Sequence, residues 1–442
     1  MINQCWAESK RYRAALIFAV VYAIVRFGAQ AYFFAQALTP QALAQDTFAA
    51  ADLQFAYIPA AEHFRDREDL YLKGSLEVLE THYLYTPVFA FFWSPILLAP
   101  LNIQIPLLTV IHLVAYGLLY NRWARLYQRY NLQGAEKLWA QLLPLFLLFT
   151  VFWDDLAILN IYLIIALFAT FGLEAVLEEN LPWASFWIGA VIIPIKPHWG
   201  FALGIPLLLG QYRFFLRLML GTLLAYLAVT GITILGGGAE YVVRQYQDYI
   251  AFLSRLTPDF PWWGPDKPFF GYNHSVLQTI LYYLGVNSFN MKLALVVKAI
   301  LLIPLGVVAL KFLRNPIQKS GRETPETALA LGFALYLGAF IWLNMVWEIS
   351  LALPIFVYLL TVVKQSWVRA ALWALFLPYA ILDVWRLASV LVLGYGVIYE
   401  RVYILTDPIL YVPWILVLII VFYGLLIRYL ANDLQQRLAK PN

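Results

Sequence analysis

Residues 14–38 read AALIFAVVYAIVRFGAQAYFFAQAL, an apolar run that follows a short basic segment ending at Arg13. A transmembrane helix needs about 20 mainly apolar residues, so this run is long enough to cross a bilayer. Ala35-Gln36-Ala37 resembles the cleavage site of a signal peptide, but the run is longer than the h-region of about 7–15 residues in such peptides. We therefore predict an uncleaved first transmembrane helix.

Similar apolar runs recur along the whole chain. Of its 442 residues, 62% are hydrophobic and 13% are charged, whereas about 25% are charged in a typical soluble protein. Such a chain cannot cover itself with water-facing side chains. We predict an all-α, polytopic integral membrane protein of about 12 transmembrane helices, with a range of about 11–13. The expected spans are 14–36, 104–121, 138–153, 156–176, 183–196, 198–210, 216–237, 291–311, 327–346, 349–363, 367–383 and 408–430.

Charge and cysteine content exclude several classes of function. The net charge of +4 is modest and does not suggest nucleic-acid binding. Cys5 is the only cysteine, so neither a disulfide framework nor a thiolate metal site can form.

The distribution of Lys and Arg predicts the orientation, because basic residues favour cytoplasmic loops. With both termini cytoplasmic, the basic groups near the span ends all fall inside: Arg122/Arg125/Arg129/Lys137, Arg213/Arg217, Lys311/Arg314/Lys319/Arg322, Lys364/Arg369 and Arg428/Arg437/Lys440. This topology requires the proline-interrupted segment 84–101 to lie along the outer face. The pair 183–196 and 198–210 stays open, because Lys196-Pro197-His198 breaks the run between them.

Two long external loops follow from this topology. The first, 39–83, is acidic. The second begins near Gly236 with an amphipathic helix, whose apolar and charged faces have the spacing of a 3.6-residue turn. The apolar face comprises Val242, Tyr246, Tyr249, Leu253 and Leu256, and the charged face Arg244, Asp248 and Arg255. Such a helix either lies in the membrane interface or packs as a lid on neighbouring helices.

Asp52 follows the first span and precedes an aromatic-rich helical segment that includes Tyr57, a candidate contact for the sugar or the acceptor. A carboxylate at this position can act as a general base on a hydroxyl that reaches the membrane surface. Alternatively, Asp52 caps the helix that follows it.

Further polar groups interrupt the apolar sequence. Asp154 and Asp155 are expected in a tight outside turn, where they could bind a divalent cation or be ordinary turn residues. Lys196 and His198 suit a phosphate by charge and hydrogen bonding, although Lys196 could instead be a lysine that extends from a helix end toward water.

The second loop combines aromatic and compact polar groups that suit a sugar, namely Trp263, Asn273, His274 and Ser275. Interfacial tryptophan belts have a similar composition. Glu348 is an embedded polar candidate as well. Asp383 and Arg386 form another candidate pair, which an internal ion pair would explain equally well.

Several of these motifs together resemble a known family. They are the Asp-x-x-x-x-Tyr setting of Asp52, the run YTPVFAFFWSP over 85–95, the mid-chain Lys196-Pro197 and the later Asn273-His274-Ser275. The pattern is similar to the GT-C superfamily, specifically glycosyltransferase family 87, the polyprenyl-phosphate-mannose-dependent mannosyltransferases, over about residues 14–365.

The resemblance implies roles for particular residues. Asp52 would be the catalytic base, Lys196 with His198 would bind the donor phosphate, and Asn273 with Ser275 would match an Asn-x-Ser motif. The sequence departs from the family where His274 replaces a frequent Gln, and where Trp347-Glu348 replaces a His. The second departure puts the acceptor side, or a second polar contact to the donor, in question.

The resemblance also predicts an organisation and an activity. The single transmembrane domain 1–442 would comprise a GT-C module (14–237, including the first loop 39–83 and the interfacial segment 84–101), the second loop 238–290 and C-terminal helices 291–442. The activity would be an inverting transfer, on the extracytoplasmic face, of mannose or another hexose or pentose from a polyprenyl-phosphate donor to a lipid or glycan acceptor. A divalent metal is compatible with this chemistry but not required.

A transporter or flippase is the alternative, because it too combines many spans with buried charges and broken helices. The absence of an internal repeat and the length of the acidic external loop favour the transferase.

Overall fold

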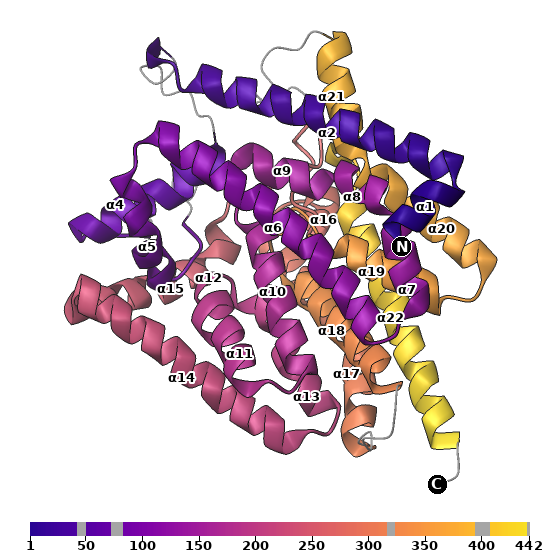
Figure 1. Cartoon of the computed structure of the whole chain (residues 1–442). Helices are drawn as coiled ribbons and strands as arrows, with labels where there is room; N and C mark the ends of the chain where they lie inside the picture. The colour runs from indigo at the N-terminus through magenta and orange to yellow at the C-terminus, as the bar shows by residue number, and fades with distance from the viewer. Residues whose placement is uncertain (42–49, 72–82, 316–322, 394–406, 440–442) are drawn as a thin grey trace.

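The fold was analysed in a computed structural model, which describes residues 1–41, 50–71, 83–315, 323–393 and 407–439. All secondary structure in these ranges is helical, as the sequence predicts (Figure 1). Of the basic groups used above to set the orientation, Lys319, Arg322 and Lys440 lie outside the described residues, as do 42–49 and 72–82 of the first loop.

Six helices are long and apolar enough to cross a membrane. They are α2 (Lys10–Ala37), α6 (Leu101–Arg129), α14 (Tyr212–Gly237), α17 (Ser288–Arg314), α18 (Glu323–Trp342) and α22 (Trp414–Ala439). Two bent units raise the number of candidate spans to eight. The first unit joins α7 (Gln133–Gln141) to α8 (Leu143–Leu148) and α9 (Thr150–Ile158), and the second joins α20 (Ser366–Ala380) to α21 (Leu382–Leu393).

The remaining expected spans form shorter helices, so the predicted count of about 12 is not confirmed. Three of them correspond to α10 (Tyr162–Leu177), to α11 (Leu181–Ser185) with η4 (Phe186–Ile192) and α12 (Ile193–Ile195), and to α19 (Ala352–Val362). The segment 198–210 forms only the 3-10 helix η5 (Pro197–Gly204) and α13 (Ile205–Leu208). Prolines explain part of this difference, because each removes a backbone donor and interrupts a regular helix.

The segment 84–101 also stays short. It forms α5 (Pro87–Trp93) and the 3-10 helix η3 (Ser94–Leu98), which together are too short to count among the candidate spans. It packs beside α4 (Ile58–Asp66), the helix that continues from the region of Asp52.

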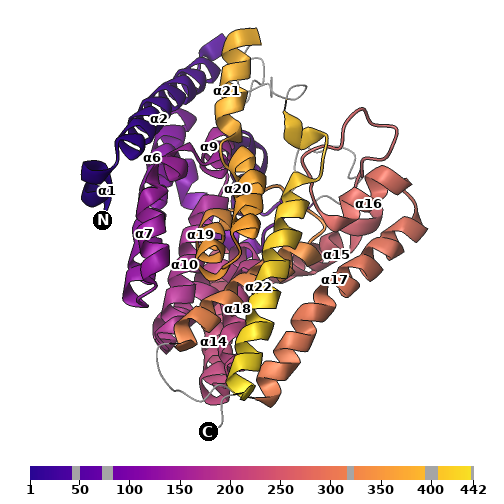
Figure 2. The ribbon, with the colours of Figure 1, turned by 90° about the vertical axis from the view of Figure 1, so that its right-hand side faces the viewer.

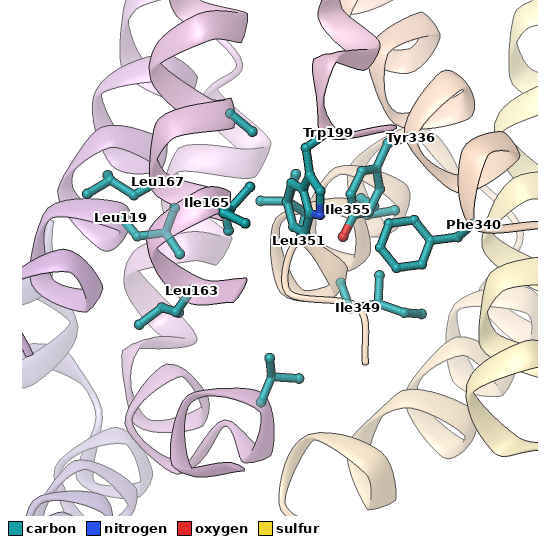
Figure 3. Packing of buried hydrophobic residues seen from close by; sticks show 14 of the residues in the cluster. Leu119, Leu163, Ile165, Leu167, Trp199, Tyr336, Phe340, Ile349, Leu351 and Ile355 are labelled. Carbon is teal, nitrogen blue, oxygen red and sulfur yellow. The ribbon is translucent and has the colours of Figure 1, made fainter. Parts of the chain in front are cut away.

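The core lies around α18 and α19. In the apolar stretch of α18, 72% of residues are buried, against 17% in α14 and in α17, so α18 is central and the other two are peripheral. Figure 2 shows α18, α19 and α22 between α6 and α7 on one side and α15 (Ala239–Asp259), α16 (Val276–Leu284) and α17 on the other. Figure 3 shows Trp199 beside Tyr336, whose ring centroid is 5.2 Å away.

The predicted amphipathic helix of the second loop is confirmed as α15, but its buried face differs from the expected one. The buried residues are Tyr241, Val242, Gln245 and Phe252, whereas Leu253 is 41% exposed. This difference arises because α15 packs on the first loop, where Gln245 Oε1 accepts a hydrogen bond from the backbone N–H of Leu70 at 2.8 Å. α15 is therefore packed as a lid on that loop.

A glycine triplet sets the junction between α14 and α15. A Cβ on Gly236 would lie 2.3 Å from the ring of Phe91, and one on Gly237 would lie 2.7 Å from the ring of Phe64. Gly238 has a φ of 89°, which glycine adopts without the cost that a side chain brings. These glycines allow α4, α5 and α15 to gather on the left of Figure 1, while both marked chain ends lie in its right half.

The described ranges contain two further short elements. α1 (Ile2–Glu8) precedes the first span, and the 3-10 helix η8 (Pro408–Leu410) precedes α22.

Candidate active site

Asp52 lies at the start of a π-helical turn, η1 (Leu53–Tyr57), which continues directly into α4. The Asp52 side chain makes no capping hydrogen bond to this turn, so the capping alternative is wrong. The turn has the wider spacing of a π-helix, because the N–H of Ile58 donates to the carbonyl of Leu53, five residues back. π-Helical turns are often found at functional sites.

Tyr57 ends this turn and is 1% exposed. Its hydroxyl donates to Asn160 Oδ1 at 3.0 Å, accepts from the N–H of Ile161 at 3.2 Å and lies 3.1 Å from the hydroxyl of Tyr85. The structure therefore places the Tyr57 hydroxyl in an internal network that joins the first loop to α5 and to the start of α10.

Lys196 lies in the break between α12 and η5, as the Lys-Pro sequence predicts. Its ammonium donates a hydrogen bond to the hydroxyl of Tyr162, and it lies 3.7 Å from the ring centroid of Tyr162 and 5.1 Å from that of Tyr85. The residue is only 9% exposed. Lys196 thus points into the protein, and the alternative of a lysine extending to water is wrong.

Three carboxyl groups lie within electrostatic range of this ammonium. They belong to Asp52, Glu348 and Asp155, which come from three separate parts of the chain. The structure therefore brings together four residues that the sequence singled out, although the sequence predicts Asp155 in an outside turn. The Lys196 ammonium can pair with an anionic group that arrives there, and a neighbouring carboxylate can accept a proton.

Glu348 reaches this cluster from the segment between α18 and α19, outside the candidate spans. Its Oε1 accepts a hydrogen bond from Ser350 Oγ at 3.0 Å. Burial, with a smaller contribution from Asp154, raises the pKa of Glu348 to about 8. Glu348 is therefore protonated at neutral pH and has an O–H that can donate.

Asp154 and Asp155 lie inside α9, so the expected outside turn is wrong. Asp154 pairs with Arg386 at 2.5 Å. Asp155 Oδ2 accepts from the N–H of Leu163 at 2.9 Å and lies 3.6 Å from Nε2 of His112. The two carboxylates therefore contact different partners. These contacts stabilise two adjacent acidic side chains within one helix. Among the described residues, no group of three or more His, Cys, Asp or Glu could hold a metal ion.

Both ring nitrogens of His112 face backbone carbonyl oxygens. Nδ1 lies 2.7 Å from the carbonyl of Leu108, and Nε2 lies 2.5 Å from that of Asn160. A neutral imidazole carries one N–H, so the ring can donate to one of these two carbonyl oxygens.

Asp383 and Arg386 each form an ion pair with a residue outside this candidate pair. Arg386 binds Asp407 at 2.7 Å in addition to Asp154. Asp383 binds Arg26 of α2 at 3.0 Å. Each charge connects α21 to a distant part of the chain.

The Asn273-His274-Ser275 segment lies against the end of α18. Asn273 Nδ2 donates to the carbonyl of Asn344 at 2.9 Å, and its Oδ1 accepts from the N–H groups of Val346 and Ser275 at 3.1 Å each. Ser275 Oγ caps α16 by accepting from the N–H of Gln278 at 3.1 Å. Asn273 thus holds the segment that leads to Glu348, and Ser275 caps the neighbouring helix α16.

His274 is fully buried, and neither ring nitrogen has a hydrogen-bond partner among the described residues. Burial, together with the charge of Arg386, lowers the pKa of His274 to about 3, so the ring is neutral. Its two nitrogens offer one donor and one acceptor.

His198 and Trp263, which the sequence also predicts for the site, lie beside aromatic side chains. The ring of His198 is 5.8 Å from that of Phe340. The ring of Trp263 is 5.1 Å from that of Phe269, and it lies against Gly271.

Sequence reasoning missed Tyr85, Asn160 and Tyr162 as individual site residues, because nothing local marks a tyrosine or asparagine at a helix end. It also missed Lys298, which is 3% exposed inside α17. The signal was present, because a lysine within an apolar run singled out Lys196 in the same way.

Comparison with known proteins places this site in a family. The family model of glycosyltransferase family 87 matches residues 83–344. The chain belongs to glycosyltransferase family 87. The match is shorter than the expected range of 14–365; it includes Lys196 and Tyr162, whereas Asp52 and Glu348 lie outside it. No curated protein and no solved structure matches the chain.

As a member of this family the protein is a membrane glycosyltransferase, which uses a sugar donor and an acceptor. The fold, with its 6–8 candidate spans, fits that class.

Proposed function

We propose that the protein transfers a sugar from a polyprenyl-phosphate donor to a hydroxyl of a lipid or glycan acceptor, with inversion at the anomeric carbon. The observation that carries this proposal is the convergence of Asp52, Lys196 and Glu348 on one buried polar cluster in a family 87 chain. Mannose, or another hexose or pentose, is the proposed sugar.

The chemistry needs one base and one cation. Asp52 takes the proton of the acceptor hydroxyl while its oxygen forms a bond to the anomeric carbon, and the bond from that carbon to the phosphate oxygen breaks. Lys196 offsets the charge that develops on the leaving phosphate. Phosphate leaves readily, so the second carboxylic acid that glycoside hydrolysis requires is not needed.

Neighbouring groups fit subsidiary roles in this scheme. Protonated Glu348 can donate a hydrogen bond to the donor without adding negative charge. His198 lies two residues from Lys196 and is proposed as a second phosphate contact. His274 is proposed to contact the sugar or acceptor, because its ring nitrogens have no partner among the described residues. A divalent metal is not required.

We place the active site on the extracytoplasmic face of the cell membrane and both termini in the cytoplasm. The excess of Lys and Arg in the opposite loops supports this orientation. A donor with a lipid tail then reaches the cluster sideways through the bilayer. The family match favours this transferase over a transporter or flippase.

The test uses the purified full-length protein in detergent with a panel of polyprenyl-phosphate sugars and a membrane lipid extract. We expect an acceptor whose mass increases by one hexose or pentose. Asp52→Asn should reduce kcat about 10²- to 10⁴-fold, the usual contribution of a general base. Asp66→Asn, at an exposed carboxylate that pairs with Arg65, is the matched control and should leave the rate unchanged. Transfer by Asp52→Asn at the wild-type rate would falsify the assignment of the base.

A further inference from the structure

The turn between α9 and α10 is held in an unfavourable backbone conformation. Leu159 has a φ of 51° and a ψ of 47°, the left-handed region that a bulky side chain rarely adopts, and it is 1% exposed. Such a conformation persists only where the surrounding structure imposes it, and it is often found at functional sites. The contacts of the next residues, 160–162, indicate what this turn does.

Asn160 is fixed from two sides. Its N–H donates to the carbonyl of Asp155 at 2.9 Å, and its own carbonyl lies 2.5 Å from Nε2 of His112 in α6. Its side chain Oδ1 accepts from the hydroxyl of Tyr57 at 3.0 Å and from the N–H of Ile161 at 2.7 Å. Asn160 is 9% exposed, so water has little access to these bonds. The turn therefore presents a fixed acceptor to Tyr57.

The bond from Tyr57 to Asn160 holds one end of the η1 turn, and Asp52 lies at the other end. In a regular α-helix, residues five apart point about 140° away from each other. The five-residue spacing of the π-helical hydrogen bond brings Asp52 and Tyr57 closer to one face. Holding the Tyr57 hydroxyl thus sets the rotation of the turn that carries Asp52.

The same turn also holds the cation. Tyr162, two residues after Asn160, begins α10, and its hydroxyl accepts the hydrogen bond of the Lys196 ammonium. Asn160 and Tyr162 therefore connect one short segment to the helix of Asp52 and to Lys196.

We propose that Asn160 is a positioning residue, and that the turn 159–162 fixes Asp52 relative to Lys196. This inference rests on the proposed function, in which Asp52 is the base and Lys196 binds the phosphate. A displacement of about 1 Å can cost about 10²-fold in rate even when the displaced groups stay intact. Asn160 and Tyr57 then act on the reaction without contacting the substrate.

The activity test compares Asn160→Ala and Tyr57→Phe with wild type. Each should lower kcat about 10- to 100-fold and leave the KM for the donor within about two-fold. Because both variants remove the hydrogen bond between Tyr57 and Asn160, the double variant should be no slower than the slower single variant. Asn160→Asp keeps the acceptor oxygen and should have a higher kcat than Asn160→Ala.

Tyr358→Phe is the matched control. Tyr358 is 1% exposed, and its hydroxyl donates to the carbonyl of Glu326 at 2.9 Å, outside the polar cluster. This variant loses a comparable buried hydrogen bond and should keep the wild-type kcat. A purely structural role for Tyr57 would lower the melting temperature of both tyrosine variants equally, with no difference in kcat per folded molecule.

Hydrogen exchange measured by mass spectrometry gives a readout that does not need activity. Asn160→Ala and Tyr57→Phe should each speed amide exchange in the helix 51–66, and Tyr358→Phe should not. If wild type transfers no sugar, the proposed function fails, and the exchange result still decides whether Asn160 fixes this helix. Unchanged exchange and unchanged kcat in Asn160→Ala, with Asp52→Asn inactive, would overturn the positioning role alone. An altered donor KM with an unaltered kcat would overturn it as well.

Discussion

Lys298 in α17 donates a hydrogen bond to Asn344 Oδ1, with Nζ and Oδ1 2.5 Å apart. The same ammonium donates to the carbonyls of Trp342 at 2.8 Å and Leu343 at 3.1 Å. All three donors of the lysine are therefore used, and they satisfy carbonyl groups at the end of α18 that have no partner within the helix. Asn344 Nδ2 in turn donates to Thr257 Oγ1 of α15 at 2.7 Å. Lys298 thus joins three helices immediately before the segment that carries Glu348.

We expect Lys298→Met to lower the free energy of unfolding by about 1–3 kcal/mol, because it leaves buried carbonyl groups without a donor. The measurement is thermal unfolding of the purified protein in detergent. Lys292→Met, at an exposed position of the same helix, is the control and should change the melting temperature little. A Lys298→Met variant as stable as wild type would show that the ammonium contributes no net stability.

The contrast between Lys298 and Lys196 shows how far sequence reasoning extends. A lysine in an apolar run indicates that the ammonium has a partner inside the protein. The partners themselves lie far away in the chain, 34 residues for Lys196 with Tyr162 and 46 for Lys298 with Asn344. Local patterns carry no information about such pairs. The sequence therefore identified Lys196 but not Tyr162, whose hydroxyl accepts the hydrogen bond of the lysine.

Lys196 leads to the second prediction, which concerns donor binding. A hydrogen bond to a charged group contributes about 1.5–3 kcal/mol, so Lys196→Gln should weaken binding of polyprenyl phosphate about 10- to 100-fold. The dissociation constant can be measured by titration of the protein with polyprenyl phosphate. Lys267→Gln, at an exposed lysine beside Asp266, is the control. Equal affinities of Lys196→Gln and wild type would remove Lys196 from the phosphate site.

The third prediction concerns the buried charges around Arg386. Its guanidinium contacts both Asp154 and Asp407, and Asp407 is fully buried. Arg386→Gln removes the positive charge that pairs with the buried carboxylate of Asp407, which costs about 3–5 kcal/mol. Thermal unfolding should therefore show a much lower melting temperature than wild type.

Arg65→Gln provides the comparison, because Arg65 and its partner Asp66 are exposed. Its melting temperature should stay close to that of wild type, since surface ion pairs contribute little. If Arg386→Gln were as stable as Arg65→Gln, the buried cluster would have no structural role.

The pattern of spans was predicted better than the length of each helix. Hydropathy located α2, α6, α14, α17, α18 and α22, whose apolar runs are uninterrupted enough to stay helical. It could not predict that 198–210 forms only the 3-10 helix η5 and the short α13. Nor could it place Asp154 and Asp155 inside a helix, because their partners Arg386 and His112 become neighbours only in the folded chain.

The fourth prediction is a pH dependence of stability that arises from Glu348. Its pKa is about 8 in the folded protein, mainly because of burial, against 4.5 for an ordinary glutamate. Between these values the folded state holds a proton that the unfolded state has released. Stability therefore falls as the pH rises from about 4.5 to about 8, because the unfolded state binds fewer protons. Above the folded pKa, no further loss arises from this group.

Glu348→Gln isolates this contribution, because glutamine has nearly the shape of protonated glutamate and cannot ionise. We expect the melting temperature of wild type in detergent to decrease between about pH 6 and about pH 8, and the decrease to be smaller in Glu348→Gln. Glu240→Gln, which alters an exposed carboxylate in the first turn of α15, is the control and should keep the wild-type slope. Identical slopes in wild type and Glu348→Gln would mean that Glu348 is already ionised at neutral pH. It would then act in the cluster as a second negative charge beside Asp52 rather than as a hydrogen-bond donor.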